Sequence, residues 1–166
     1  MVVGCNFCPF AIREVKKESI YFEVIAGTNV IALKALSAAL VKMDTQEEIE
    51  TMFLLLPQNF ESFSEYLKLV HGAELLIKKA GYEGIYQVAS FHPAYVFADS
   101  NENDAANYTN RSPYPMLHIL REESLSRAID SYPDTSQIPE KNDAYARQKG
   151  LDYMLRLRAA CMERAQ

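Results

Sequence analysis

Three segments rich in β-branched and aromatic residues alternate with two helical patterns, and this alternation constrains the fold most. The predicted strands cover 19–26, 49–56 and 85–91, and the predicted helices cover 30–43 and 61–80. An order of β-α-β-α-β predicts an α/β or α+β fold, in which helices pack on a small sheet of three or four strands.

The residues after the third strand change in character. Residues 92–115 are rich in Ser, Asn, Asp and Pro, and a connection this long within a compact domain is usually functional or mobile. We predict a helix over 112–132, because Ser112 can cap it and prolines are tolerated in a first turn. A short linker, 133–139, then leads to a predicted last helix over 140–163.

Length and composition narrow the class of protein. A chain of 166 residues predicts a single globular domain over 1–166. Its net charge of −5 argues against binding to nucleic acid or to an anionic membrane surface. Three cysteines are too few for a secreted disulfide framework, and no apolar run reaches the ~20 residues of a membrane span. We therefore expect a cytoplasmic protein.

Cys5 and Cys8 form a C-x-x-C motif before a helix predicted over 10–17. Unpaired N–H groups at a helix start stabilise a thiolate, which makes such a cysteine reactive. No predicted strand leads into the motif, as thioredoxin-type chemistry requires, and no second pair completes a zinc site. Three interpretations stay open: two structural cysteines, Cys8 as a site thiol, or a redox pair. Cys8 is the better candidate because Pro9 holds it at the helix entrance.

His92 follows the third predicted strand, at a position where open α/β sheets place their ligands. Pro93 favours an extended backbone at His92, so the imidazole can project from the strand end. This predicts a general acid or base, and the alternative is a histidine hydrogen-bonded within a turn.

A second candidate group falls on the helix predicted over 112–132. His118, Arg121 and Glu122 are spaced i, i+3 and i+4, so they would share one helix face. His118 and Glu122 could then ligate a metal together, or the carboxylate could orient the imidazole. The alternative is a solvated helix face with one ordinary side-chain pair.

An anion site is the third expectation. Arg111 would lie just before the start of that helix and Arg121 further along it. Two arginines converging near a helix start can bind a carboxylate or phosphate. Asn107 and Asn110 would add neutral donors and acceptors beside them.

Three stretches of sequence carry a resemblance to a known family. They are CPFA at 8–11, ASFHPAYVFAD at 89–99 and NYTNRSPYPMLHILRE at 107–122. Together they resemble a bacterial family of unknown function whose members are single-domain proteins. The resemblance implies a longer N-terminal helical lead before CPFA and a residue other than cysteine at position 5. It implies no activity, cofactor or substrate.

Our leading hypothesis is an enzyme that acts on an anionic small molecule by hydrolysis or group transfer, in a cleft at the C-terminal edge of the sheet. His92 or His118 would be the general acid or base, and Cys8 a nucleophile or a metal ligand. The candidate catalytic residues are Cys8, His92, His118 and Glu122, which are also the candidate metal ligands. The candidate substrate-binding residues are Asn107, Asn110, Arg111 and Arg121.

Two other classes of function remain open. A non-catalytic binding module could use the same cleft for an anionic metabolite or an acidic peptide. A structural subunit could form an oligomer through the arginine-rich C-terminal helix. The absence of P-loop, G-x-G-x-x-G, G-x-S-x-G and H-E-x-x-H motifs weakens several familiar enzyme classes. The sequence leaves open which cofactor, if any, the protein binds.

Overall fold

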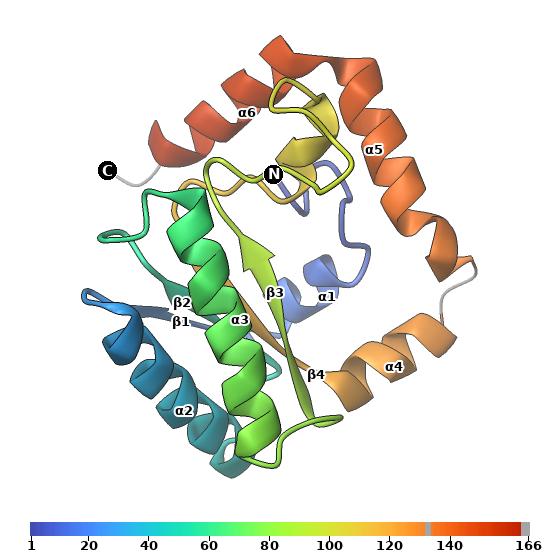
Figure 1. Ribbon diagram of the computed structural model, residues 1–166. Helices are drawn as coiled ribbons and strands as arrows, with labels where there is room; N and C mark the ends of the chain where they lie inside the picture. Colours follow the sequence, from blue (N-terminus) through green and yellow to red (C-terminus); the bar gives the residue numbers. More distant parts are fainter. Residues whose placement is uncertain (132–133, 164–166) are drawn as a thin grey trace.

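The computed structural model describes residues 1–131 and 134–163 (Figure 1). Its strands are β1 (Ile20–Val24), β2 (Thr51–Leu55), β3 (Tyr86–Phe91) and β4 (Met116–Arg121). Its α-helices are α1 (Ala11–Lys16), α2 (Asn29–Thr45), α3 (Phe63–Lys79), α4 (Glu122–Asp130), α5 (Ile138–Lys149) and α6 (Leu151–Glu163). Two short 3₁₀ helices are η1 (Ala105–Thr109) and η2 (Thr135–Gln137).

The four strands form one mixed sheet in the order β1-β2-β4-β3. β1 and β2 are parallel, and β4 is antiparallel to both of its neighbours, β2 and β3. The predicted β-α-β-α-β order and the predicted α/β class are confirmed. The fourth strand enters the middle of the sheet, between the second and third strands of that pattern.

The two predicted helices between the strands, α2 and α3, lie together on one side of the sheet (Figure 1). The main hydrophobic cluster fills the space beneath them. The central strands supply it with every second residue, namely Met52, Leu54, Leu117 and Ile119, all fully buried. This alternation is the period of a strand with one face against a core.

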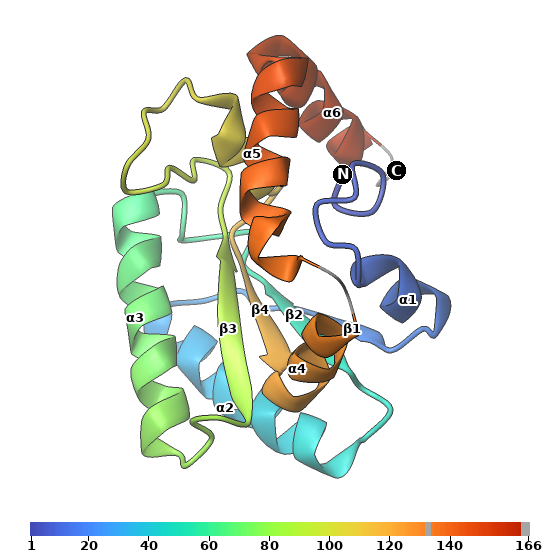
Figure 2. The ribbon, with the colours of Figure 1, turned by 90° about the vertical axis from the view of Figure 1, so that its right-hand side faces the viewer.

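A second layer lies on the other side of the sheet and beyond the end of β3 (Figure 2). It is formed by the N-terminal segment, α1, α4 and α5, with η1 and α6 above the end of β3. A smaller hydrophobic cluster lies in this second layer, at the packing of η1 against α5 and α6. Its buried members are Phe7, Ala105, Tyr108, Ala146 and Met154.

The helix predicted over 112–132 is wrong over its first half, where the chain forms β4, and only Glu122–Asp130 is helical. The prolines were interpreted as first-turn residues, whereas the strand begins directly after Pro115. β4 is hydrogen-bonded on both edges, and such long-range pairing overrides a local helical spacing. The predicted helix end at Tyr132 and linker start at Pro133 lie outside the described residues.

The last helix, predicted as one element over 140–163, is two helices, α5 and α6. Gly150 separates them with a φ of +80°, a conformation that residues with a Cβ rarely adopt. Within residues 1–131 and 134–163, no helix is both long enough and apolar enough to cross a membrane.

Candidate functional site

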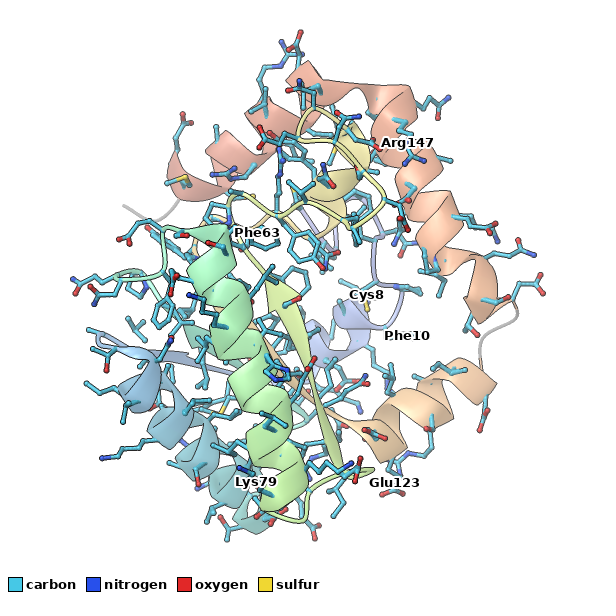
Figure 3. All side chains as sticks on the ribbon, in the orientation of Figure 1. Cys8, Phe10, Phe63, Lys79, Glu123 and Arg147 are labelled. Atoms are coloured by element: carbon cyan, nitrogen blue, oxygen red, sulfur yellow. The ribbon has the colours of Figure 1, made fainter. Side chains whose placement is uncertain are left out.

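A cavity of about 690 Å³ lies between the N-terminal segment, the end of β3, the loop leading into η1, and α5. Figure 3 shows Cys8 in this region, between the sheet and α5. The apolar wall includes Phe7, Phe91 and Phe97. The polar lining includes Cys8, Asp99, Asn110, Asn142, Asp143 and Arg147.

The N-terminal wall of the cavity is tied to α5. Asn142 donates its side-chain N–H to the backbone oxygen of Phe7, at 2.7 Å. The Phe7 ring packs edge-on against Tyr145, with centroids 5.9 Å apart. These contacts hold Cys8, the next residue, at the cavity wall.

An ion pair ties α5 to the loop before η1. Arg147 donates from Nη2 to Asp104 Oδ2 at 2.8 Å and from Nε to Asp104 Oδ1 at 3.1 Å. Asp104 also accepts the backbone N–H of Ala106, at 2.9 Å. The Arg147 hydrogen bonds, followed by that N–H, lower the pKa of Asp104 to about 2. Asp104 is therefore ionised, and it balances the charge of Arg147 at the cavity rim.

The two predicted asparagines shape the loop. Asn107 is buried, and its side chain accepts the N–H of Phe97 and donates to the carbonyl of Asn101. Asn110 donates its amide N–H to Ser90 O at 3.1 Å, and it lines the cavity. The polar character of this stretch therefore serves first to satisfy buried backbone groups of a long connection.

The predicted convergence of Arg111 and Arg121 is wrong. Arg111 donates to the carbonyls of Tyr95 and Glu102, both at 2.9 Å. Arg121 is the last residue of β4, near the C-terminal end of α2. There it donates to Ile49 O at 3.1 Å and to the carbonyl of Met43. Neither guanidinium lines the cavity. The assumed helix had placed both arginines near one terminus.

Both ring nitrogens of His92 form hydrogen bonds with backbone groups of the protein. Nδ1 accepts the N–H of Ala94 at 3.0 Å, so Nε2 carries the proton and donates to Phe60 O at 2.8 Å. The side chain is fully buried, and burial is the main cause that lowers its pKa. The geometry matches the turn-bound alternative, and a catalytic role for His92 stays a prediction.

His118 lies on β4, with its ring stacked on Phe53 at a centroid distance of 3.9 Å. Its Nε2 is 2.5 Å from Thr51 Oγ1, and that hydroxyl donates to Ile119 O. Thr51 must then accept from Nε2–H, which leaves Nδ1 as an unprotonated acceptor. Burial lowers the pKa of His118 to about 4, so the imidazole is neutral at pH 7.

Glu122 begins α4 and donates its backbone N–H to Ile85 O, at 2.9 Å. It borders a separate hollow of about 400 Å³, together with His71 and Gln87. The shared helix face predicted for His118 and Glu122 is not formed, because His118 is in a strand. In the described part of the chain, no three His, Cys, Asp or Glu side chains are grouped so that they could hold a metal ion.

Of the eight candidate residues, the cavity brings together Cys8 and Asn110. Sequence reasoning missed Phe91, Asn142 and the acidic pair Asp99 and Asp143 in its lining. Asp143 and Arg147 carry a visible signal, because opposite charges spaced i, i+4 share a helix face. The other lining residues carry no such local signal, since their proximity depends on how α5 packs.

A cavity of this size lies in the range of small-molecule sites. The fold and the cavity together define an α/β protein with a mixed four-stranded sheet between two helical layers and a small-molecule-sized pocket in the second layer. The chain belongs to the family described as protein of unknown function (DUF1415), whose model matches residues 1–156. No curated protein and no solved structure matches the chain. The resemblance to a family of unknown function is thereby confirmed.

Proposed function

We propose that this protein binds a small organic cation with an apolar body in the cavity beside Cys8. The observation that carries the proposal is the charge of the cavity's polar lining. Among the residues that the structure describes, the carboxylates of Asp99 and Asp143 accept no hydrogen bond, while the charge of Arg147 is balanced by Asp104.

Each nitrogen-bearing side chain of the lining is held by at least one hydrogen bond within the protein. The side-chain N–H groups of Asn142 and Asn110 point to the carbonyls of Phe7 and Ser90. Arg147 is held by Asp104 through two nitrogens. These bonds fix the orientation of the three side chains, and Asp104 offsets the positive charge that would attract an anionic ligand.

The acceptors remain available. Asp143 forms a long ion pair with Arg147, 3.9 Å from its Nη2, which is beyond hydrogen-bond distance. Asp99 has no hydrogen-bond partner among residues 1–131 and 134–163. Two carboxylates at one cavity favour a positively charged N–H donor, since hydrogen bonds to charged groups are the stronger ones. An anionic ligand would meet these carboxylates instead of Arg111 and Arg121.

The apolar wall favours a ligand with a ring or an alkyl body. Phe7, Phe91 and Phe97 line the cavity, and aromatic side chains supply large contact areas. Aromatic faces also attract cations. Both features suit an amine carried on an apolar group.

The geometry favours a non-catalytic binding module over catalysis, although for a cation in place of the expected anionic metabolite or acidic peptide. Within the described residues, no hydrogen bond joins Cys8 to a histidine or a carboxylate, as activation of a nucleophile by an adjacent base requires. We place this binding function in the cytoplasm, because Cys5, Cys8 and Cys161 are free thiols, which persist in a reducing compartment.

A series of three ligands that differ only in their head group tests which ligand charge the cavity prefers. Benzylamine, benzyl alcohol and benzoate share a ring and differ in their head group. We expect isothermal titration calorimetry to find the tightest binding for benzylamine, and Asp143→Asn to weaken it at least about tenfold. Asp152→Asn, the same charge change on an exposed site of α6, should leave the affinity unchanged. Tighter binding of benzoate would refute the proposal.

Site-resolved alkylation locates the ligand. Bound benzylamine should slow the reaction of iodoacetamide with Cys8, which lines the cavity, and not with the exposed Cys161. If the amine binds while Cys8 reacts at its former rate, the ligand occupies another place and the proposed site is wrong.

A further inference from the structure

β1 is an edge strand with one unpaired side. Among the described residues it pairs only with β2, through bonds that include Thr51 N–H to Ser19 O and Ile25 N–H to Leu55 O. In a parallel ladder, alternate residues direct both backbone groups to the neighbour. Since Ser19 and Ile25 face β2, residues 20, 22 and 24 direct their N–H and C=O groups away from the sheet.

The side chains of β1 leave this edge unprotected. Phe22 is 59% exposed and Val24 is 67% exposed. The strand sequence, IYFEV, contains no lysine and no proline, the residues with which edge strands usually discourage pairing. An edge of this composition is suited to receive another strand.

We propose that a second copy of this chain pairs with β1, antiparallel, with Phe22 on the two-fold axis. The two sheets then form one continuous sheet of eight strands. This register joins the outward-facing groups of Phe22 to those of Phe22 in the second copy, and those of Ile20 to those of Val24. A neighbouring register centred on Glu23 would oppose two carboxylates, which destabilises a strand pair.

Charges on the α2 side of the sheet complement one another in the same register. Lys42, on α2, lies over the Tyr21 ring with its Nζ 3.5 Å from the centroid. Centring the pair on Phe22 sets Glu23 of the second copy opposite Tyr21, next to Lys42. The two-fold axis repeats this contact, so two opposite-charge pairs flank the new strand pair.

Aromatic rings on the other face of the sheet continue across the axis. Phe22 stacks on Phe53 with centroids 5.3 Å apart, and Phe53 stacks on His118. In the proposed pair, Phe22 of one copy packs against Phe22 of the other. The row of Phe22, Phe53 and His118 in each copy then continues into the same row of the second copy. Cross-strand aromatic pairs stabilise sheets, and the most exposed ring of the row becomes covered.

Charge-swap variants test the axis directly. Sedimentation velocity over a concentration series should find a dimer for the wild type. Phe22→Lys and Phe22→Glu should each weaken it at least about tenfold, because like charges then meet on the axis. An equimolar mixture of the two variants should restore the dimer as a heterodimer. Val41→Lys, on an exposed site of α2 (55%), should leave it intact.

Two further measurements do not depend on how well the charged variants fold. Val24→Pro removes one outward N–H without touching the ladder to β2, and it should also weaken the dimer. In the wild type, the amides of residues 20, 22 and 24 should exchange more slowly with deuterium as concentration rises. A monomer at every concentration, unchanged exchange of these amides, or a dimer that survives all three variants would overturn the proposal.

Discussion

The layer formed by α2 and α3 and the layer formed by η1, α5 and α6 are held by different interactions. The first covers a large hydrophobic cluster whose central members, such as Leu36 and Leu54, are fully buried. The second covers a small cluster and depends on polar ties, namely Asp104 to Arg147 and Asn142 to the Phe7 carbonyl. The first layer is therefore stabilised mainly by the burial of apolar side chains, and the second mainly by a few hydrogen bonds and an ion pair.

This difference explains where the cavity lies. A close-packed hydrophobic layer leaves little room for a ligand, whereas η1 and α5 meet the N-terminal segment across the 690 Å³ cavity. Ligand-binding segments generally come from the less stable parts of a protein. The second layer is accordingly where we expect local opening and where ligand binding should add stability.

The largest loss of stability should come from a substitution in the layer formed by α2 and α3. Leu54→Ala removes a fully buried side chain of β2 and should lower the free energy of unfolding by about 2–5 kcal/mol. Val41→Ala, on an exposed site of α2, should change it by less than about 0.5 kcal/mol. Urea denaturation measures both, and equal effects would contradict the assignment of stability to this cluster.

A smaller loss of stability should follow from protonation of His118, which lies on the face of the sheet beneath the second layer. Its pKa is about 4 in the folded protein against 6.5 without burial, so folding favours the neutral imidazole. The resulting stability is complete above pH 6.5 and is lost as the pH falls toward 4, by about 3 kcal/mol. His118→Phe should flatten the pH dependence of urea unfolding in this window. His71→Gln, at an exposed site, should not, and an equal flattening there would contradict this account.

The smallest loss of stability should follow from breaking the ion pair between Asp104 and Arg147 in the second layer. Asp104→Asn removes the charge that holds Arg147. Because the folded pKa of Asp104 is about 2 against 3.8 ordinarily, its contribution is present above pH 3.8 and lost as the pH falls toward 2. Hydrogen exchange should quicken in η1 and α5 and stay unchanged in α2. Asp152→Asn is the matched control, and uniform quickening would show that the two layers are not separate.

The same contrast separates what could be predicted from what could not. The strands and helices of residues 19–91 were predictable because their signals are local: β-branched and aromatic residues in the strands, and apolar residues at helical spacing in the helices. β4 was not, although Leu117 and Ile119 alternate as in a strand, because Ser112 and the prolines that follow it also suit the start of a helix. Pairing with β2 and β3 decided between the two.

The candidate site was predictable only as a set of residue types. Cys8 and Asn110 do line the cavity, whereas the chemistry expected of Arg111 and Arg121 depended on a helix that does not form. Their side chains satisfy backbone carbonyls instead. A sequence indicates that a residue can donate a hydrogen bond, and it does not indicate which acceptor the fold will bring near.

The sequence by itself determined the class of fold and the order β1-α2-β2-α3-β3, because the signals for helices and strands are local. Only the tertiary structure decided that β4 enters the sheet between β2 and β3, that Gly150 divides the last helix, and that Asp104 meets Arg147. The physical reason is that these features depend on contacts between distant segments. Arg121 and the Met43 carbonyl lie 78 residues apart in the chain, and no spacing rule reaches across such a distance.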